Sequence, residues 1–290
     1  MGAADVVPGV SGGTMAFILG IYARLLHAIR AFDLSLLALL ARGRFLDAAR
    51  HVDLAFLVAL GLGIGSALAF FTRVVPLPAL IVTSPEPVYA VFFGLVLGSV
   101  VVLLRTGAHP GATQWGWLAL GAALGLAVVT LVPADTPDAP WFLFLSGALA
   151  ITAMILPGIS GSFVLLLLRK YATVFDAIGH LQLSVLVPFA LGAVVGLMLF
   201  SRALSWLLDR FHRQTVLTII GVLVASLWVI WPFQDRAYET VRGKVRLVHS
   251  SPVAPSGSAS EIALVVTLAI AGFALVLVVE WLARRRGGDA

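Results

Sequence analysis

Long apolar runs are the feature that most constrains what this chain can fold into. Stretches of about 18 or more mainly apolar residues recur along it, which is typical of membrane-spanning helices. Charged residues make up only 11% of the chain, whereas a soluble domain is about a quarter charged. We therefore expect an all-α polytopic membrane protein. The predicted spanning helices are residues 54–72, 88–104, 115–132, 184–208, 215–232 and 262–283.

Composition also excludes several kinds of site. The chain has no cysteine, so neither a disulfide framework nor a thiolate metal site can form. The six histidines show no metal-ligand spacing, and no Ser-His-Asp arrangement is visible. The net charge of +5 indicates orientation and contact with anionic headgroups rather than nucleic-acid binding. We expect no cofactor, no metal, no nucleic-acid partner and no catalytic residues.

A Pro-Gly-x-Ser-Gly stretch occurs twice, each time inside apolar sequence. It reads VVPGVSGGT at residues 6–14 and ILPGISGSF at residues 155–163, with a constant offset of 149 residues. We call these stretches the first and second motif. Further repeat matches are Tyr22 with Tyr171, Leu60-Gly61 with Leu191-Gly192, Gly65 with Gly196, Gly94 with Gly221, and Ser99 with Ser226.

These matches divide the chain into two membrane repeats, residues 1–135 and 136–290, within a single integrated membrane domain. Each repeat holds a motif region, at about residues 3–30 or 141–178, followed by three spanning helices. Internal repeats of this kind are typical of secondary transporters. The acidic turn PADTPDAP, residues 133–140, connects the two repeats. Residues 234–260 are predicted to be a long polar loop.

Positive charge favours a particular topology for the motif regions. If the arginines of residues 30–53 are cytoplasmic, as the positive-inside rule requires, only a re-entrant second motif also makes Arg210, Arg213 and residues 284–286 cytoplasmic. Residues 141–155 and 163–178 would then be half-helices of about 22 and 24 Å, which are too short to span. We expect two re-entrant Pro-Gly hairpins, inverted repeats and a cytoplasmic C-terminus. The leading arm of the first hairpin would precede Met1, so the sequence is expected to start late.

The two motifs are predicted to converge near the membrane midplane as half-sites for one anionic headgroup. A helix that begins at membrane depth offers free N–H groups and a dipole to an anion, and the hydroxyl groups add donors. The alternative is that glycine and serine merely allow close helix packing. The candidate phosphate-binding residues are Pro8, Gly9, Ser11, Gly12, Gly13, Thr14, Pro157, Gly158, Ser160, Gly161, Ser162, Arg24 and Arg169.

Three charged residues near the motifs have two interpretations each. Asp5 is a candidate for coupling transport to a proton or a cation, or else a helix cap or surface residue. Arg24 and Arg169 follow their motifs closely enough to pair with a phosphate. Arg24 in particular could instead be an interfacial anchor.

The runs GAADVVPGVSGGTMAFILGIYARL and ITAMILPGISGSFVLLLLRKYATVFDAI closely resemble the DUF368 family of bacterial membrane proteins. The resemblance covers essentially the whole chain. It implies a translocase in the bacterial inner membrane that returns undecaprenyl phosphate, a polyprenyl-phosphate lipid, from the outer to the cytoplasmic leaflet for cell-wall synthesis. Family members often have an acidic residue after the tyrosine that follows each motif. Ala23 and Ala172 stand there in this chain, so coupling to protons or sodium stays open, as does the oligomeric state.

Three other functions compete with this one. Undecaprenyl-diphosphate phosphatase is similar in architecture, but its chemistry uses an arginine directly after the motif serine, where this chain has Gly12 and Gly161. An ion-coupled transporter of a small soluble anion would need a sealed polar path. A purely structural scaffold would tolerate replacement of Ser11 and Ser160.

Overall fold

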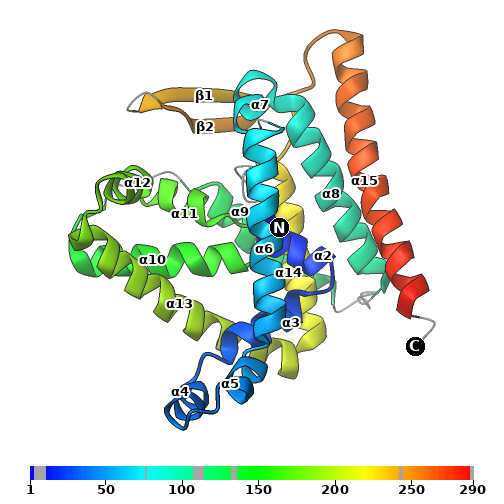
Figure 1. Cartoon of the computed structure of the whole chain (residues 1–290). Coiled ribbons are helices and arrows are strands. Elements are labelled where there is room, and N and C mark those ends of the chain that lie inside the picture. Colours follow the sequence, from blue (N-terminus) through cyan, green and yellow to red (C-terminus); the bar gives the residue numbers. More distant parts are fainter. Residues whose placement is uncertain (3–10, 76, 107–113, 132–135, 242–243, 288–290) are drawn as a thin grey trace. The chain divides into compact units, whose positions relative to one another are not determined.

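The computed structural model describes residues 1–2, 11–75, 77–106, 114–131, 136–241 and 244–287, and it is mostly helical (Figure 1). Contacts divide the chain into two compact units. Unit 1 contains Met1–Phe70 and Leu131–Thr215, and unit 2 contains Phe71–Thr130 and Val216–Ala290. Each unit therefore takes residues from both predicted repeats.

Unit 1 holds both motif regions and the long helix that packs against them. Its helix α13 packs along α10 and also contacts α3. The backbones of α10 and α13 lie so close together that a Cβ on Gly147 or Gly192 would collide with the facing helix. The helices of unit 1 are α2 (Gly12–Ile18), α3 (Tyr22–Arg30), α4 (Leu34–Ala41), α5 (Phe45–His51), most of α6 (Leu54–Arg73), α10 (Pro140–Ile155), α11 (Gly161–Leu167), α12 (Tyr171–His180) and α13 (Leu183–Arg210).

The described part of unit 2 is built from two pairs of helices, the short helix α7 and one β-hairpin. Helix α8 packs along α15, and α14 contacts α9. The two strands are antiparallel, with Gln234 opposite Pro252. The elements of unit 2 are α7 (Leu77–Thr83), α8 (Pro85–Thr106), α9 (Trp115–Val129), most of α14 (His212–Val229), β1 (Gln234–Val241), β2 (Lys244–Pro252) and α15 (Ala259–Gly287).

The two helix pairs of unit 2 use equivalent residues. A Cβ on Gly94 of α8 would meet the carbonyl of Ala269 in α15, and one on Gly221 of α14 would meet the carbonyl of Leu118 in α9. Gly221 lies 127 residues after Gly94, and Ala269 lies 151 residues after Leu118. The reciprocal contacts, Gly272 with Val91 and Gly121 with Thr218, have the same two offsets. The sequence repeat is thus matched by a repeat in helix packing.

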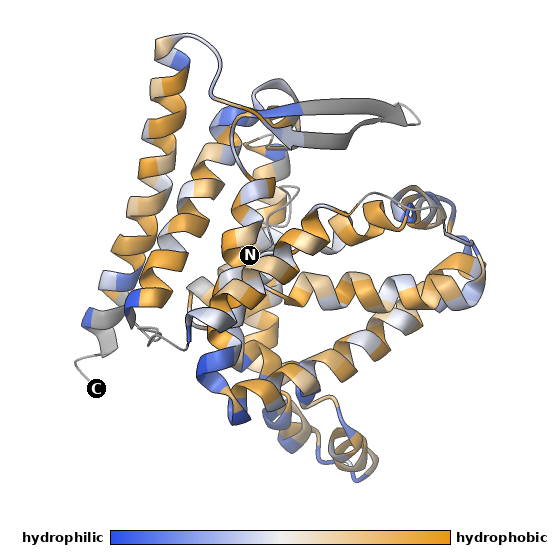
Figure 2. Ribbon diagram, turned by 180° about the vertical axis from the view of Figure 1, so that it is seen from behind, coloured by the Kyte–Doolittle hydropathy of each residue, from blue (hydrophilic) through white to orange (hydrophobic). Residues whose placement is uncertain are grey.

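Most of the predicted spanning helices are confirmed by length and composition. Among the described residues, five helices are long and apolar enough to cross a membrane: α6, α8, α13, α14 and α15. Figure 2 shows them as mainly apolar ribbons. The predicted span 115–132 is the shorter helix α9 of 15 residues, about 22 Å long. A helix is confirmed at the predicted residues 141–155 as α10, which has Pro140 at its first position, where no N–H is needed.

Two local predictions were wrong. Residues 163–178 do not form one half-helix, because the chain breaks between α11 and α12 at Arg169, whose φ is +52°. Residues 234–260 are not simply a loop, because they contain β1 and β2. The connection 30–53 also contains helices, α4 and α5. Re-entry and inversion of the motif hairpins stay predictions.

Candidate functional site

The second motif interrupts the helix that precedes it. Helix α10 ends at Ile155, and Leu156 is extended, as the residue before a proline must be. Pro157 has no N–H with which to continue the helical bonding. Gly158 then has a φ of +93°, a conformation that only glycine adopts without strain. This break leaves carbonyl groups at the end of α10 and the N–H of Gly158 without helical partners.

The first motif region supplies partners for these groups. The hydroxyl of Ser11 donates to the carbonyl oxygen of Met154 at 3.0 Å, and the hydroxyl of Tyr22 donates to that of Ile155 at 3.1 Å. The N–H of Gly158 donates to Oγ1 of Thr14 at 2.9 Å. We call these three hydrogen bonds the motif clasp. The two motif regions, predicted to converge, are therefore in direct contact within unit 1.

Glycine is required where these backbones meet. A Cβ on Gly13 would lie 2.5 Å from the carbonyl oxygen of Ile155, and one on Gly161 would lie 2.6 Å from that of Ala150. Either distance is shorter than any normal contact. A larger residue at Gly13 would push the two motif regions apart, and one at Gly161 would push α11 away from α10 within the second motif region. These contacts support a packing role for Gly13 and Gly161, and their role in anion binding stays a prediction.

The hydroxyl groups of the two motifs are used differently. Ser11 caps helix α2, accepting a hydrogen bond from the N–H of Gly13 at 3.1 Å, and both Ser11 and Thr14 are buried. Ser160 makes no such cap on α11. Its hydroxyl instead lies 2.7 Å from that of Ser162, which is exposed. The first motif is thus occupied with internal bonds, whereas the second presents a pair of hydroxyl groups at the surface.

The motif regions nevertheless have the same local structure. Helices α2 and α11 are each seven residues long and begin at equivalent positions, Gly12 and Gly161. Each is followed by a residue with positive φ, Gly20 at +68° and Arg169 at +52°, again 149 residues apart. The repeat read from the sequence therefore extends to backbone conformation. Arg169 occupies a position where its counterpart is glycine.

The two candidate arginines lie in different surroundings. Arg24 donates two hydrogen bonds to the carboxylate of Asp53, at 2.6 and 3.1 Å, and its guanidinium lies over the ring of Phe56. The hydrogen bond from Arg24 holds the pKa of the Asp53 carboxyl below its usual range. Arg169 is exposed at the break between α11 and α12. Arg24 is thus already paired with Asp53.

Sequence reasoning missed Tyr22 and Lys170. Tyr22 was noted only as a repeat match, although a hydroxyl recurring at a fixed offset was the available signal. Lys170 is only 3% exposed, and its ammonium donates to the carbonyl oxygen of Thr136 at 2.7 Å and to the carboxylate of Asp138 at 2.5 Å. The acidic composition of residues 133–140 could have indicated such a cationic partner.

Some predicted residues lie outside this description. Asp5, Pro8 and Gly9 fall in residues 3–10, which are not among the described residues. Within the described parts of the chain, no group of three or more His, Asp or Glu side chains could hold a metal ion.

Comparison with known proteins identifies the family. The model of the VCA0040-like family, described as undecaprenyl phosphate translocase-like, matches residues 1–246. A Vibrio cholerae protein named polyprenyl-phosphate transporter is 43% identical over 235 residues, which cover 81% of this chain and 76% of the relative. A Staphylococcus aureus protein of the same name is 30% identical over 250 residues, covering 80% and 83%. No solved structure matches. The chain therefore belongs to the undecaprenyl phosphate translocase-like family, DUF368, as the paired motifs had indicated.

Proposed function

We propose that this protein is a polyprenyl-phosphate translocase of the bacterial inner membrane. It moves undecaprenyl phosphate from the outer to the cytoplasmic leaflet, so that the carrier can be used again in cell-wall synthesis. The observation that carries this proposal is the family match together with two curated relatives that are both named as polyprenyl-phosphate transporters. The C-terminus is cytoplasmic in this proposal.

The chemical problem is the phosphate rather than the lipid tail. A charged phosphate cannot enter hydrocarbon unaided, because losing its hydration costs many kcal/mol. The tail is apolar and can stay among the lipid chains throughout. The protein therefore needs a polar site for the phosphate inside an otherwise apolar bundle.

We place this site at the second motif. The hydroxyl groups of Ser160 and Ser162 lie together at the surface of unit 1, where they can donate to phosphate oxygens. Gly158 and Gly161 keep the neighbouring backbone free of side chains. In the first motif, the hydroxyl groups of Ser11 and Thr14 are used in the motif clasp. While these bonds are intact, Ser11 and Thr14 contribute to phosphate binding only indirectly.

Alternating exposure of the site completes the proposal. The two motif regions act as opposed re-entrant hairpins of inverted repeats, and a change in the motif clasp exposes the phosphate to one leaflet and then to the other. In this proposal the guanidinium of Arg169 pairs with the phosphate group of the lipid. Asp5 is the candidate for proton or cation coupling.

The competing functions have less support. Both curated relatives are named as transporters rather than enzymes. A phosphatase would also lack the arginine that its chemistry needs after each motif serine, since Gly12 and Gly161 stand there. Transport of a small soluble anion is the second candidate, because exposed hydroxyl groups bind any phosphate. The experiment below separates the two.

A flipping assay in sealed liposomes tests the proposal. We would follow how fast a fluorescent polyprenyl phosphate in the outer leaflet becomes inaccessible to a quencher. The test variant is Ser160→Ala with Ser162→Ala. The matched control is Ser66→Ala, because Ser66 is an exposed serine whose hydroxyl bonds, among the described residues, only to the carbonyl of Gly63 in its own helix α6.

The expected result is protein-dependent flipping that the double variant slows strongly and the control does not. Parallel liposomes would measure uptake of inorganic phosphate and release of phosphate from polyprenyl diphosphate. Absence of flipping under every ion gradient would overturn the translocase. Uptake of inorganic phosphate alone would establish the soluble-anion transporter, and release of phosphate would establish an enzyme.

A further inference from the structure

The segment between α3 and α6 exposes large apolar side chains although it lies outside the candidate membrane spans. Helix α4 has the sequence LSLLALLA, and none of its residues is buried. Leu34 is 81% exposed and Leu37 60%, while Phe45 and Leu46 at the start of α5 are 68% and 77% exposed. A cluster of large apolar side chains at the surface marks a place where something else covers it.

Length and charge restrict how α4 can meet a membrane. Its eight residues span about 12 Å, far less than the roughly 30 Å of a hydrocarbon core. Charged residues stand at both of its ends: Asp33, which caps it by accepting from the N–H of Leu36 at 3.0 Å, and Arg42. Insertion along the membrane normal would carry one charged end into hydrocarbon. An orientation in the plane of the membrane keeps both ends among the headgroups.

The charges around α4 are unevenly balanced. The carboxylates near α4 already have partners. Asp33 contacts His51, Asp47 pairs with Arg44, and Asp209 pairs with Arg30. Four arginines of unit 1 have no ion pair or side-chain hydrogen bond with any other described residue: Arg42, Arg50, Arg202 and Arg210.

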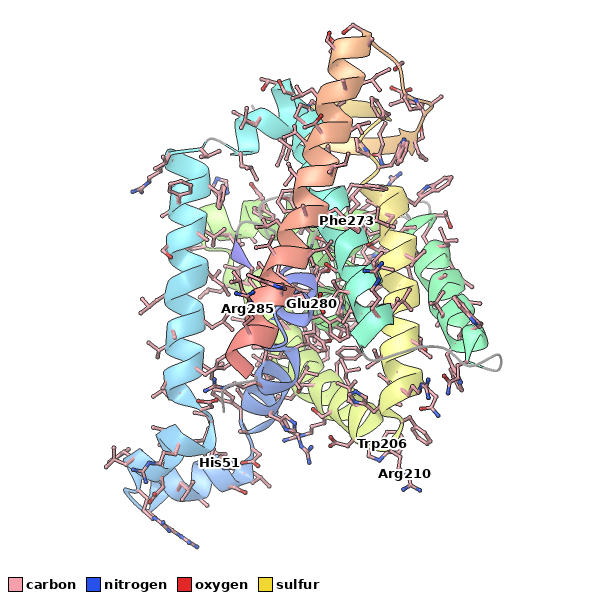
Figure 3. The ribbon with its side chains drawn as sticks, turned by 90° about the vertical axis from the view of Figure 1, so that its right-hand side faces the viewer. His51, Trp206, Arg210, Phe273, Glu280 and Arg285 are labelled. Atoms are coloured by element: carbon pink, nitrogen blue, oxygen red, sulfur yellow. The ribbon has the colours of Figure 1, made fainter. Side chains whose placement is uncertain are left out.

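These arginines gather toward one end of unit 1. His51 of α5 lies at the same end of this unit as Trp206 and Arg210 of α13 (Figure 3), and the pair of Arg30 with Asp209 joins α3 to that end of α13. Arg202 and Trp206 are one turn apart on α13, and both are exposed. Exposed tryptophan and arginine near the end of an apolar helix are typical of the headgroup level.

We propose that α4 and α5 form an interfacial hairpin that lies in the membrane plane and binds a leaflet of anionic phospholipid. The leucine and phenylalanine side chains enter the outer part of the acyl region. The unpaired arginines contact lipid phosphates at the same level. The interaction is with the bulk leaflet rather than with the transported lipid, so it does not depend on the proposed function.

Site-directed spin labelling tests this in the full protein. The chain has no cysteine, so each single-cysteine variant carries one label. Leu37→Cys reports on α4. Leu199→Cys, 63% exposed in the candidate span α13, is the lipid reference, and Ser256→Cys, in the exposed turn before α15, is the water reference. In vesicles of phosphatidylcholine with or without phosphatidylglycerol, collision with oxygen and with a water-soluble nickel chelate measures the surroundings of each label.

The expected result is that the label at position 37 favours oxygen over the nickel chelate, as at position 199 but at shallower depth. Adding phosphatidylglycerol should increase this preference severalfold, and Arg42→Gln with Arg50→Gln should remove the increase. A label at position 37 that collides with the chelate as freely as at position 256 would overturn the proposal. Protection that disappears when the protein is diluted in lipid would also overturn it, because a second copy would then be the cover.

Discussion

Removing the acceptor in the motif clasp should destabilise the protein measurably. The variant is Thr14→Val, which keeps the shape of the side chain and removes Oγ1, the atom that accepts from the N–H of Gly158 at 2.9 Å. Thr14 is only 1% exposed, so water cannot easily replace the hydroxyl. A buried donor left without a partner costs about 1–3 kcal/mol, whereas side-chain hydrogen bonds in membrane helices average about 0.6 and reach about 1.7. We expect a loss of about 1–2 kcal/mol, because this donor lies at a helix break and has no partner in a helical ladder.

The assay is reversible unfolding in mixed micelles, followed by circular dichroism as the fraction of denaturing detergent rises. Thr14→Ser is the matched control, since it keeps Oγ1 and should lose less than Thr14→Val. Tyr22→Phe, which removes the donor to Ile155, should cost about 0.6 kcal/mol. The double variant should show coupling, because both bonds join the same two segments. Equal stability of Thr14→Val, Thr14→Ser and the unmodified protein would refute the clasp as a stabilising element.

Three further predictions concern other parts of the chain. Arg169→Gly should raise stability by about 1 kcal/mol by removing the strain of a positive φ, yet slow polyprenyl-phosphate flipping. Leu181→Gly relieves the same kind of strain without removing a charge, so its flipping rate should be unchanged. Gly192→Val should cost about 1–3 kcal/mol in the unfolding assay by forcing α10 away from α13, whereas Gly61→Val, at the repeat-equivalent position with open space around it, should cost less. Asp53→Asn should lower the melting temperature near neutral pH but not at pH values below the lowered pKa of Asp53, because a carboxyl with a depressed pKa stabilises the fold above its unfolded pKa and loses this effect as pH falls through its folded value.

The elements that the sequence predicted well are those with local signals. Helix α10 was predicted within one residue, because a proline stands at its start and Pro157-Gly158 follows its end. The long spans were readable from their apolar composition. The contact between the two motif regions was expected from the repeat, because two such motifs that enter an apolar bundle from opposite faces would converge near the midplane.

The elements that were missed depend on tertiary contacts. The break at Arg169 could not be predicted, because neither glycine nor proline stands there. Next to it, Lys170 is held by Thr136 and Asp138, which are more than thirty residues away in the sequence. The sequence also did not show that the two motifs use their hydroxyl groups differently. Ser11 and Ser160 occupy equivalent positions, but the first bonds to a backbone carbonyl and the second to Ser162. The sequence spacing showed which residues recur, but not which of them form hydrogen bonds inside the protein.

The two helix pairs of unit 2 restrict which conformational changes are possible. Each helix pair takes one helix from each repeat, and glycine lets the backbones touch at Gly94 with Ala269 and at Gly221 with Leu118. If one repeat rocked as a rigid body against the other, both contacts would have to break, and no hydrophobic force would replace them in lipid. The motif clasp joins the two motif regions within unit 1, so its three hydrogen bonds can break while both helix pairs of unit 2 stay in contact. We therefore expect the conformational change to preserve α8 with α15 and α14 with α9, and to separate the two motif regions instead.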